Sequence, residues 1–215
     1  MPSITPPDVC AVLFDYGQVL SLPADPTAWA TLRSLTGASE ESLHHSYWQH
    51  RDEYDRGGLT SEAYWQTLSQ ELGFTLDDDK LTVLRAADIE VWGGQNEPMV
   101  EWAHRLQQSG MRTGILSNIG DAMESGLRAK HAWIADFTHC VWSHQYKIIK
   151  PAAAIYKYAI DGLGRPAANI LFIDDREKNV QGAIAAGLQA IQYTTHAEFL
   201  RTMRERGYGS LLDIS

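Results

Sequence analysis

Four short polar motifs in this chain carry side chains that could process a phosphate group. Asp15 follows the apolar run 12–14, and Gly17 ends the strand that this run predicts. Three further motifs follow or adjoin apolar runs, namely Ser117-Asn118, Lys150 before Pro151, and Asp174-Asp175. Open α/β sheets place their chemistry just beyond the carboxyl ends of parallel strands. We therefore expect these motifs to meet at one edge of a sheet and to form a phosphate-processing site.

Asp15 is the candidate nucleophile, because a carboxylate can attack phosphorus and form an aspartyl-phosphate. The attack brings an anion towards a phosphate dianion, and two like charges 4 Å apart cost about 4 kcal/mol at an effective dielectric constant of 20. A cation must lie between them, and Mg²⁺ suits because it binds one or two carboxylates together with phosphate oxygens and water. Its predicted ligands are Asp15 and Asp175, with Asp174 close by and the Gly17 carbonyl as a neutral oxygen.

Other polar residues are expected to complete the site. Lys150 would place a second positive charge on the phosphoryl oxygens and on the nucleophile. The Ser117 hydroxyl and the backbone N–H groups that follow it, beginning at Asn118, would bind the remaining oxygens. Asn179 is spaced to orient a metal-bound water or a carboxylate. Each motif alone also fits a turn, a helix cap or a surface lysine, so the prediction rests on the order and spacing of all four.

The composition is that of a soluble globular protein. With 215 residues the chain forms one large domain or a core with an insertion, and 44% hydrophobic and 21% charged residues are ordinary values. The net charge of −9 argues against a nucleic-acid or anionic-membrane surface. No apolar run approaches the roughly 18 residues that span a bilayer. The expected partner is therefore a small molecule, and no pattern in the sequence reveals the oligomeric state.

The cysteines and the first eight residues bear on the cellular location of the protein. Cys10 and Cys140 fit neither a metal-ligand spacing nor a disulfide framework, which favours reduced, buried thiols in a cytoplasmic protein. Residues 1–8 lack both a basic region and an apolar region. They are expected to form a short leader and not a secretory signal.

From residue 91 onward the pattern alternates between strands and helices. The expected strands are 111–116, 170–173 and 189–193. The expected helices begin at Pro98, at Ala152 and after Asp175, and their buried faces hold Met99, Trp102, Ala103 and Leu106, then Ile155, Tyr156, Ala159 and Leu163, then Val180, Ala183, Ile184, Gly187 and Leu188. This alternation predicts a parallel sheet with right-handed crossovers, that is, a Rossmann-like α/β core.

The stretch from about residue 23 to 92 shows helical periodicity and no convincing strand. Thr60 can cap a helix that Gly73 ends, with Tyr64 and Leu68 on its inner face. Further helices are expected through 29–35, 42–50 and 81–91. An all-helical insert directly after the first strand is expected to cover the active edge of the sheet. We predict a core of residues 1–20 and 93–215 and a helical cap of residues 21–92.

In their strand contexts, the motifs resemble those of the haloacid dehalogenase-like (HAD) hydrolase superfamily, in the subgroup with a helical cap after the first motif. The resemblance covers nearly the whole chain. The motifs stand in the order of the superfamily: Asp15 with Gly17, Ser117-Asn118, Lys150-Pro151, and Asp174-Asp175 with Asn179. The resemblance implies Asp15 as nucleophile and Mg²⁺ as cofactor, in agreement with the charge argument. It predicts a phosphatase for a small phosphorylated metabolite, for example a sugar phosphate.

Position 17 departs from the pattern of most phosphatases of this superfamily, which carry a second aspartate there as general acid and base. The subgroup that resembles bacterial sugar-1-phosphate phosphatases also has Asp-x-Gly, so Gly17 is compatible with hydrolysis. Loss of a general acid removes a factor of about 10²–10⁴ from proton transfer unless another group substitutes. The rate and the preferred leaving group are therefore open.

Two other functions compete with the phosphatase. A 2-haloacid dehalogenase uses the same aspartate to attack carbon without a metal, but such enzymes usually have small polar residues in place of Asp174 and Asp175. Two further carboxylates beside the nucleophile are costly without a cation, which favours the phosphatase. The other alternative is a binding protein of the same fold without catalytic activity, and Gly17 is the only residue that favours it.

Substrate specificity is expected to lie in the cap, whose residues follow no readable code. Trp48, Trp65 and Trp92 are candidates to line a substrate pocket, because aromatic faces pack against sugars. Packing in the protein core is the commoner role of tryptophan. The sequence therefore leaves the substrate unnamed.

Overall fold

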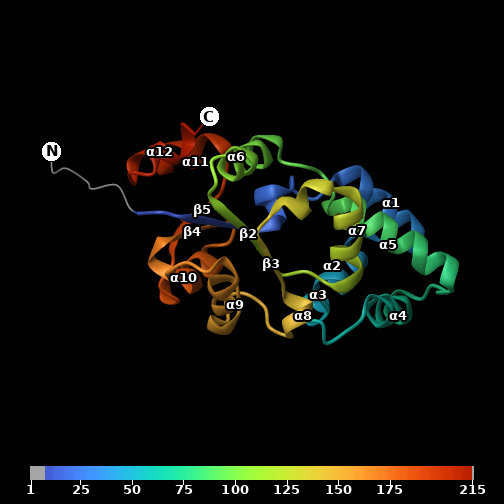
Figure 1. Ribbon diagram of the computed structural model, residues 1–215. Coiled ribbons are helices and arrows are strands. Elements are labelled where there is room, and N and C mark those ends of the chain that lie inside the picture. The colour runs from blue at the N-terminus through green and yellow to red at the C-terminus, as the bar shows by residue number, and fades with distance from the viewer. Residues whose placement is uncertain (1–7, 215) are drawn as a thin grey trace.

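Five parallel strands form one sheet (Figure 1). In their order across the sheet they are β3 (His139–Trp142), β2 (Arg112–Ser117), β1 (Ala11–Phe14), β4 (Ile170–Asp174) and β5 (Gln189–Gln192). The computed structural model describes residues 8–214, so all of the predicted leader except Asp8 lies outside the described residues. The predicted Rossmann-like parallel sheet is confirmed, and each expected strand matches to within one residue.

Helices cover both faces of the sheet. One layer consists of α6 (Glu97–Gln108), α11 (His196–Glu205) and α12 (Gly209–Leu212), and the other of α9 (Ala153–Leu163) and α10 (Glu177–Ala185). Val12 and Phe14 of β1 pack against the first layer, whereas Ala11 and Leu13 pack against the second. A strand that is buried on both faces needs apolar side chains in both directions, which explains the unbroken apolar run before Asp15.

Several elements of the core have no clear signal in the sequence. They are α7 (Asp121–Lys130), α8 (Ser143–Tyr146), β3, and the short helical turns η2 (Ala132–Asp136) and η3 (Ala167–Asn169). The strand β3 has only four residues and begins with His139, so no period of two is visible. Two residues of the expected buried face are wrong: Ile184 lies on α10 but is 46% exposed, and Gly187 is exposed and lies beyond the end of this helix. The buried stripe of α10 runs through Val180 and Ala183, and Ile184 lies on its solvent side.

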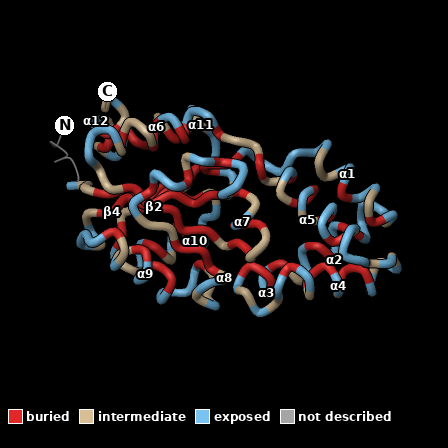
Figure 2. The backbone as a smooth tube through the Cα atoms, turned by 45° about the vertical axis from the view of Figure 1, so that its right-hand side comes forward, coloured by how far each residue is buried: buried red, intermediate tan, exposed pale blue. Residues whose placement is uncertain are grey.

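Between the first strand and α6 the chain is helical, as predicted. The short turn η1 (Tyr16–Leu20) is followed by α1 (Pro26–Thr36), α2 (Glu40–Gln49), α3 (Arg51–Asp55), α4 (Ser61–Leu72) and α5 (Asp78–Trp92). The hydroxyl of Thr60 caps α4 by accepting from the Ala63 N–H, and Gly73 ends this helix with a φ of 74°. These helices enclose a hydrophobic cluster of their own, which Figure 2 shows as a second region of buried residues.

The helical cap is attached to the core by hydrogen bonds from loops and helix ends. The Ser143 hydroxyl donates to the carbonyl of Asp55 in the cap and accepts from the Ile119 N–H at 2.8 Å. The Asp121 carboxylate accepts from the Ser61 N–H at 3.0 Å. These contacts hold the cap over the carboxyl ends of the strands. The exact boundaries at residues 20 and 92 stay a prediction.

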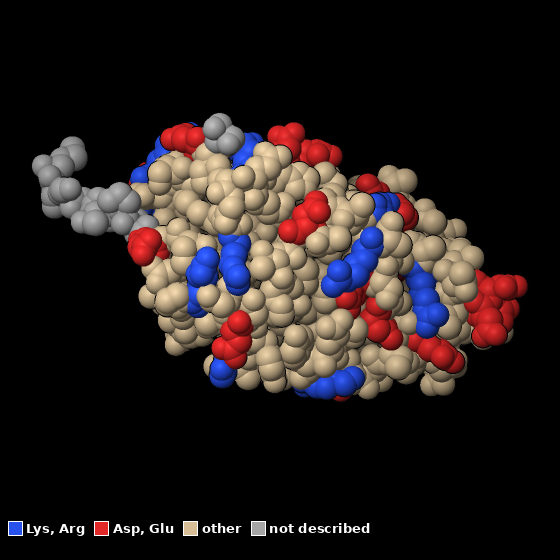
Figure 3. All heavy atoms as spheres, in the orientation of Figure 1, with Lys and Arg blue, Asp and Glu red and all other residues tan. Residues whose placement is uncertain are grey.

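Charged side chains of both signs are interspersed on the face shown in Figure 3, and acidic side chains gather at the end of the cap. No large basic patch is visible on that face. None of the helices within residues 8–214 has both the length and the apolar character needed to cross a bilayer. Cys10 and Cys140 are unpaired, and both are half-buried where the sequence suggested full burial.

Candidate active site

The register of the sheet aligns the carboxyl ends of β1, β2 and β4. Phe14 of β1 lies level with Ile115 of β2 and Ile173 of β4. The Asp15 N–H donates to the Ile173 carbonyl at 2.8 Å, which keeps the residue after β1 in line with β4. Side chains that follow these positions are therefore neighbours. In this way the fold brings Asp15, Ser117 and Asp175 to one cavity, with Asp174 buried beside them, although they are far apart in sequence.

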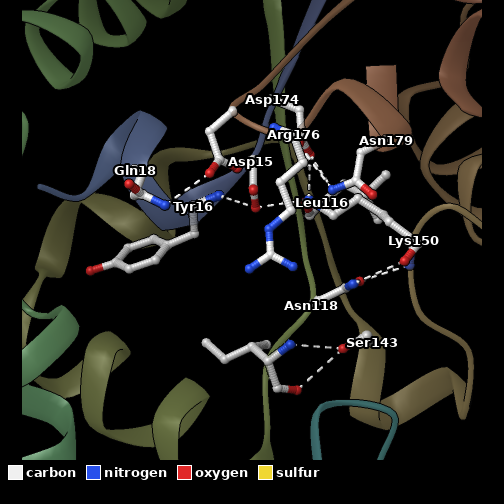
Figure 4. Close-up of polar contacts among 12 residues, drawn as sticks. Asp15, Tyr16, Gln18, Leu116, Asn118, Ser143, Lys150, Asp174, Arg176 and Asn179 are labelled. Carbon is white, nitrogen blue, oxygen red and sulfur yellow. Dashed lines mark hydrogen bonds and ion pairs between the residues drawn. The ribbon is translucent and has the colours of Figure 1, made fainter. Parts of the chain in front are cut away.

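Lys150 lies at the centre of the polar contacts in Figure 4. Its Nζ is 2.8 Å from Asp15 Oδ1 and 2.7 Å from Asp174 Oδ2, and it donates to the Leu116 carbonyl at 2.8 Å. Asn118 holds the lysine backbone from both sides: Oδ1 accepts from the Lys150 N–H at 2.8 Å, and Nδ2 donates to its carbonyl at 3.1 Å. The Asn118 side chain is thus committed to Lys150, which leaves its backbone N–H for the predicted contact with phosphate.

The two aspartates of the acidic pair have different surroundings. Asp174 is fully buried and accepts from Asn179 Nδ2 at 2.9 and 3.1 Å and from the Arg176 N–H at 2.8 Å, in addition to the lysine. Asp175 is only half-buried, and its Oδ2 accepts from Gln18 Nε2 at 2.9 Å. Asp174 therefore positions the lysine, whereas Asp175 lines the cavity. Asn179 orients a carboxylate, one of its two predicted roles.

Three carboxylates gather at this edge of the sheet, and the Lys150 ammonium is paired with two of them, Asp15 and Asp174. One oxygen each of Asp15, Asp174 and Asp175 lie within 4.8 Å of one another. Burial raises the pKa of Asp15 to about 7; the Lys150 ammonium lowers it, and the other two carboxylates raise it. Burial also raises the pKa of Asp175, and Asp174 adds to this shift. Burial lowers the pKa of Lys150, but Asp15 and Asp174 outweigh it, so this pKa is raised.

A divalent cation fits this arrangement. The excess of negative charge needs a cation, and carboxylate oxygens are the ligands that Mg²⁺ prefers. Oδ1 of Asn179 is buried without a hydrogen-bond partner among the described residues, so one more oxygen on the wall of the cavity is unsatisfied. The loop that carries the Gly17 carbonyl lines the same cavity. The donor set thus meets the requirements of the predicted magnesium site.

The turn after Asp15 is held in an unusual conformation. Gln18 has a φ of 57°, a left-handed conformation that few residues other than glycine adopt. Its N–H donates to the Ser21 hydroxyl at 3.0 Å, and its side chain donates to Asp175. Gly17 itself has an ordinary φ of −62°, and no heavy atom lies within 4 Å of the position that a Cβ would take. An aspartate at position 17 would therefore fit without backbone strain.

A cavity of about 240 Å³ opens onto these residues, and the cap supplies part of its wall. Trp48 and Trp92, two of the three tryptophans proposed from the sequence, line it. Trp65 does not, because it is buried in the hydrophobic cluster of the cap. Arg51 also reaches the cavity from the cap.

Sequence reasoning missed several residues of this wall. Met123 and Leu127 face the cavity from α7, and their spacing of four residues is the only trace of this in the sequence. Arg176 also lines the cavity, and its place directly after the acidic pair is a signal in the sequence that could have predicted it. Arg51 had no signal, because its position depends on how the cap is seated.

The family model of the haloacid dehalogenase-like hydrolases matches residues 11–187. The chain belongs to this family. The matched segment contains all the motifs and the cavity described above, so the resemblance read from the motifs is confirmed. The family establishes a hydrolase with a HAD fold.

Two curated relatives act on different substrates. Drimenol cyclase of Aspergillus calidoustus is 23% identical over 195 residues, which are 91% of this HAD chain but only 36% of the cyclase. (S)-2-Haloacid dehalogenase 4A of Burkholderia cepacia is 27% identical over 195 residues, with 85% of this chain and 81% of the dehalogenase covered. The chain thus spans about a third of the first relative and most of the second.

A solved structure shares the fold over most of the chain. A HAD family enzyme of Bacteroides thetaiotaomicron, in complex with magnesium and inorganic phosphate, superposes with a TM-score of 0.72 and 19% identity. The match covers 87% of this chain and 96% of that enzyme. At this identity the likeness shows the fold alone. The substrate of this HAD hydrolase must therefore be argued from its own residues.

Proposed function

We propose that this hydrolase removes the phosphoryl group from a small organic phosphate monoester, with Asp15 as nucleophile and Mg²⁺ as cofactor. The observation that carries the proposal is the presence of Asp174 and Asp175 beside the nucleophile. Three carboxylates with one lysine leave excess negative charge that a divalent cation neutralises. A cation among carboxylates in turn attracts a phosphate dianion. The phosphorylated metabolite is the proposed partner, and a sugar phosphate belongs to this class.

In the first step, an Asp15 oxygen forms a bond to phosphorus and the bond from phosphorus to the leaving oxygen breaks. The Ser117 hydroxyl and the Asn118 N–H would contact the phosphoryl oxygens, and the Lys150 ammonium, which is bound to Asp15, would offset their charge from beside the nucleophile. Asp15, Asp175 and the Gly17 carbonyl would hold Mg²⁺, which supplies positive charge between nucleophile and phosphate. The departing oxygen takes a proton from solvent, because position 17 offers no carboxyl group.

In the second step, water attacks the phosphorus of the aspartyl-phosphate. The bond between phosphorus and the Asp15 oxygen breaks, which regenerates the carboxylate and releases inorganic phosphate. The proton that the water loses passes to solvent or to the released phosphate. Asp174 and Asn118 serve both steps by fixing the side chain and backbone of Lys150.

Haloacid dehalogenation is the second candidate, and the relative from Burkholderia cepacia favours it. The acidic pair argues against it, because attack on carbon needs no cation while the two carboxylates raise the pKa of Asp15. Halide release from (S)-2-chloropropionate and phosphate release from phenyl phosphate separate the two functions directly. We expect release of phosphate and no release of halide.

Removal of metal is expected to abolish phosphate release, and added Mg²⁺ is expected to restore it. Without a cation, the carboxylates at Asp15, Asp174 and Asp175 repel the phosphate dianion. The measurement is turnover of phenyl phosphate after dialysis against EDTA, with and without added Mg²⁺. Full activity in the metal-free protein would contradict the phosphatase mechanism.

Mg²⁺ is also expected to raise the melting temperature, and to raise it more at pH 8 than at pH 5. In the metal-free protein the pKa of Asp15 is about 7, above its ordinary 3.8, so the folded form holds a proton that the unfolded form releases between about pH 4 and 7. Stability of the metal-free protein therefore falls as the pH rises through this window. Mg²⁺ needs the ionised carboxylate, so its effect grows with pH. Equal shifts at both pH values would contradict binding at Asp15.

Leaving-group preference follows from Gly17. Without a nearby acid to protonate a departing alkoxide, aryl, acyl and anomeric phosphates are expected to react faster than phosphates of primary alcohols. The comparison is kcat/KM for phenyl phosphate and an alkyl phosphate in the native protein and in Gly17→Asp. The substitution is expected to narrow the gap, since the backbone and the free space at position 17 admit a side chain. Equal rates for both esters in the native protein would show that another residue supplies the proton.

A further inference from the structure

The cavity has an apolar wall beyond the phosphoryl end. Trp48 of α2 and Trp92 at the end of α5 form the side that belongs to the cap, and Met123 and Leu127 of α7 lie on the side of the core. Trp92 packs against both the cap cluster and the sheet-face cluster that contains Met123 and Leu127. Trp48 is 37% exposed, so part of this residue is accessible to a ligand. This wall is the space that a leaving group attached to the phosphate would enter.

The aromatic side of this wall is held rigidly. The ring of Trp48 meets that of Trp92 edge to face, with centroids 6.0 Å apart. Nε1 of Trp92 donates to the Tyr47 hydroxyl at 2.9 Å, and that hydroxyl donates to Asp88 at 2.7 Å. Arg51 donates to the same hydroxyl. A surface fixed before binding loses little entropy when a ligand packs against it.

Arg51, the cationic side chain that the cap brings to the cavity, is already paired with carboxylates of the cap. Arg51 Nε donates to Asp55 Oδ1 at 2.8 Å, and Arg51 Nη1 lies 3.8 Å from Asp88. Among the described residues, the remaining polar cap side chain of the cavity is Asp52, which is exposed. A sugar brings several hydroxyl groups, and each buried hydroxyl needs a partner. The wall therefore suits an apolar group better than a polyol.

Volume limits the ligand further. The cavity of about 240 Å³ is smaller than the roughly 300–1,000 Å³ of sites for drug-sized ligands. It must hold the phosphoryl group at Asp15 and Lys150 as well as the leaving group. The enclosed part of this space suits one ring, and a longer group would extend from the cavity into solvent.

We propose that the leaving group is a single planar, largely apolar ring, so that the substrate is a small aryl phosphate, with the ring held between Trp48 and Trp92 on one side and Met123 and Leu127 on the other. The inference rests on the proposed phosphatase function and narrows its substrate class. An aryl oxide is a stable leaving group and needs no general acid, which agrees with the absence of a carboxyl group at Gly17.

Phosphonates test the ring site without turnover, because their carbon–phosphorus bond is not hydrolysed by this mechanism. Affinities of phenylphosphonate and methylphosphonate are measured by calorimetry in the Mg²⁺-loaded protein. We expect phenylphosphonate to bind about tenfold more tightly, since ring burial and aromatic contact add to the phosphonate contacts. Trp48→Ala is expected to remove most of this difference and to leave the affinity for methylphosphonate unchanged.

Tyr158→Ala is the matched control, because Tyr158 is an aromatic side chain of similar exposure (42%) that does not line the cavity. It is expected to keep the tenfold difference. Equal affinities for the two phosphonates, or a Trp48→Ala protein that keeps the difference, would overturn the inference. Turnover of glucose 1-phosphate at a higher kcat/KM than phenyl phosphate would overturn it as well.

Hydrolysis of acetyl phosphate distinguishes failure of the aryl-phosphate proposal from failure of the phosphatase proposal. If the protein hydrolyses acetyl phosphate with Mg²⁺ but shows no preference for the phenyl ring, the phosphatase stands and the aryl substrate is wrong. If no phosphate ester is hydrolysed, the proposed function is wrong, and the aryl substrate falls with it.

Discussion

Asp15→Asn is expected to lower phosphatase turnover by about a thousandfold or more while the fold survives. The amide keeps the shape of the side chain but removes the attacking oxygen anion and one charged ligand of the metal. Lys150 keeps its ion pair with Asp174 at 2.7 Å, so the buried ammonium stays compensated. The measurements are kcat with phenyl phosphate and Mg²⁺, and mass spectrometry of the rapidly quenched protein for the phosphorylated aspartate.

The melting temperature of Asp15→Asn shows whether the variant has lost only its activity or also its fold. Burial and two neighbouring carboxylates raise the pKa of Asp15 to about 7, so above that pH the ionised carboxylate destabilises the folded, metal-free protein relative to the unfolded one. We therefore expect metal-free Asp15→Asn to melt at pH 8 no lower than the native protein. Asp136→Asn, at an exposed position, is the control for the same chemical change and should keep full activity. Activity of Asp15→Asn within tenfold of native would exclude the covalent mechanism.

The phosphoryl end of the site could be predicted from the sequence because its residues are tied to strand ends. Asp15, Ser117 and Asp174 each stand at or directly after the last residue of a parallel strand, and the carboxyl ends of parallel strands meet at one edge of the sheet. A run of apolar residues is enough to locate such a strand. Lys150 does not follow a strand, and its place in the site is predicted from the order of the motifs alone. In the structure, the Asn118 side chain binds the backbone of Lys150 and so holds this lysine at the site.

The leaving-group end could not be predicted in the same way. Its walls come from the cap and from α7, and their meeting depends on how two hydrophobic clusters pack against one another. Trp48 and Trp65 have the same residue type and both lie on cap helices, yet Trp48 faces the cavity and Trp65 lies in the cap core. Composition and spacing do not distinguish them. Arg51 likewise gains its position from a buried pairing with Asp55 that only the folded cap creates.

The two ends of the cavity impose complementary chemistry on a substrate. At the phosphoryl end, three carboxylates lie close together, and the proposed divalent metal would offset their charge. At the other end, Arg51 of the cap is paired with Asp55, and Trp48 and Trp92 present an aromatic surface. A ligand that is charged at one end and apolar at the other satisfies both. The acidic net charge of the chain does not oppose such a ligand, because the local cations lie next to the phosphate.

Lys150→Met is expected to destabilise the fold by about 3–5 kcal/mol at pH 8 and to abolish turnover. The ammonium is 1% exposed and lies between Asp15 and Asp174, so its removal leaves two carboxylates buried without compensation. Methionine fills a similar volume, and one neighbour of the lysine Nζ is the ring of Phe172, whose centroid lies 5.5 Å away. The expected loss of stability therefore comes from the missing charge and not from a change in packing.

The dependence on pH gives this prediction its sharpest test. Lys150 lowers the pKa of Asp15, so its loss raises that pKa further above the unfolded value of 3.8. A carboxyl group with a raised pKa favours the folded state at low pH, and this advantage is lost as the pH rises. The difference in free energy of unfolding between native and Lys150→Met is thus expected to be small at pH 5 and large at pH 8. Chemical denaturation at both pH values measures it, with exposed Lys157→Met as a control that should stay within about 0.5 kcal/mol of native. A difference that does not grow with pH would mean that the lysine does not neutralise these carboxylates, and the charge argument for the metal would lose its basis.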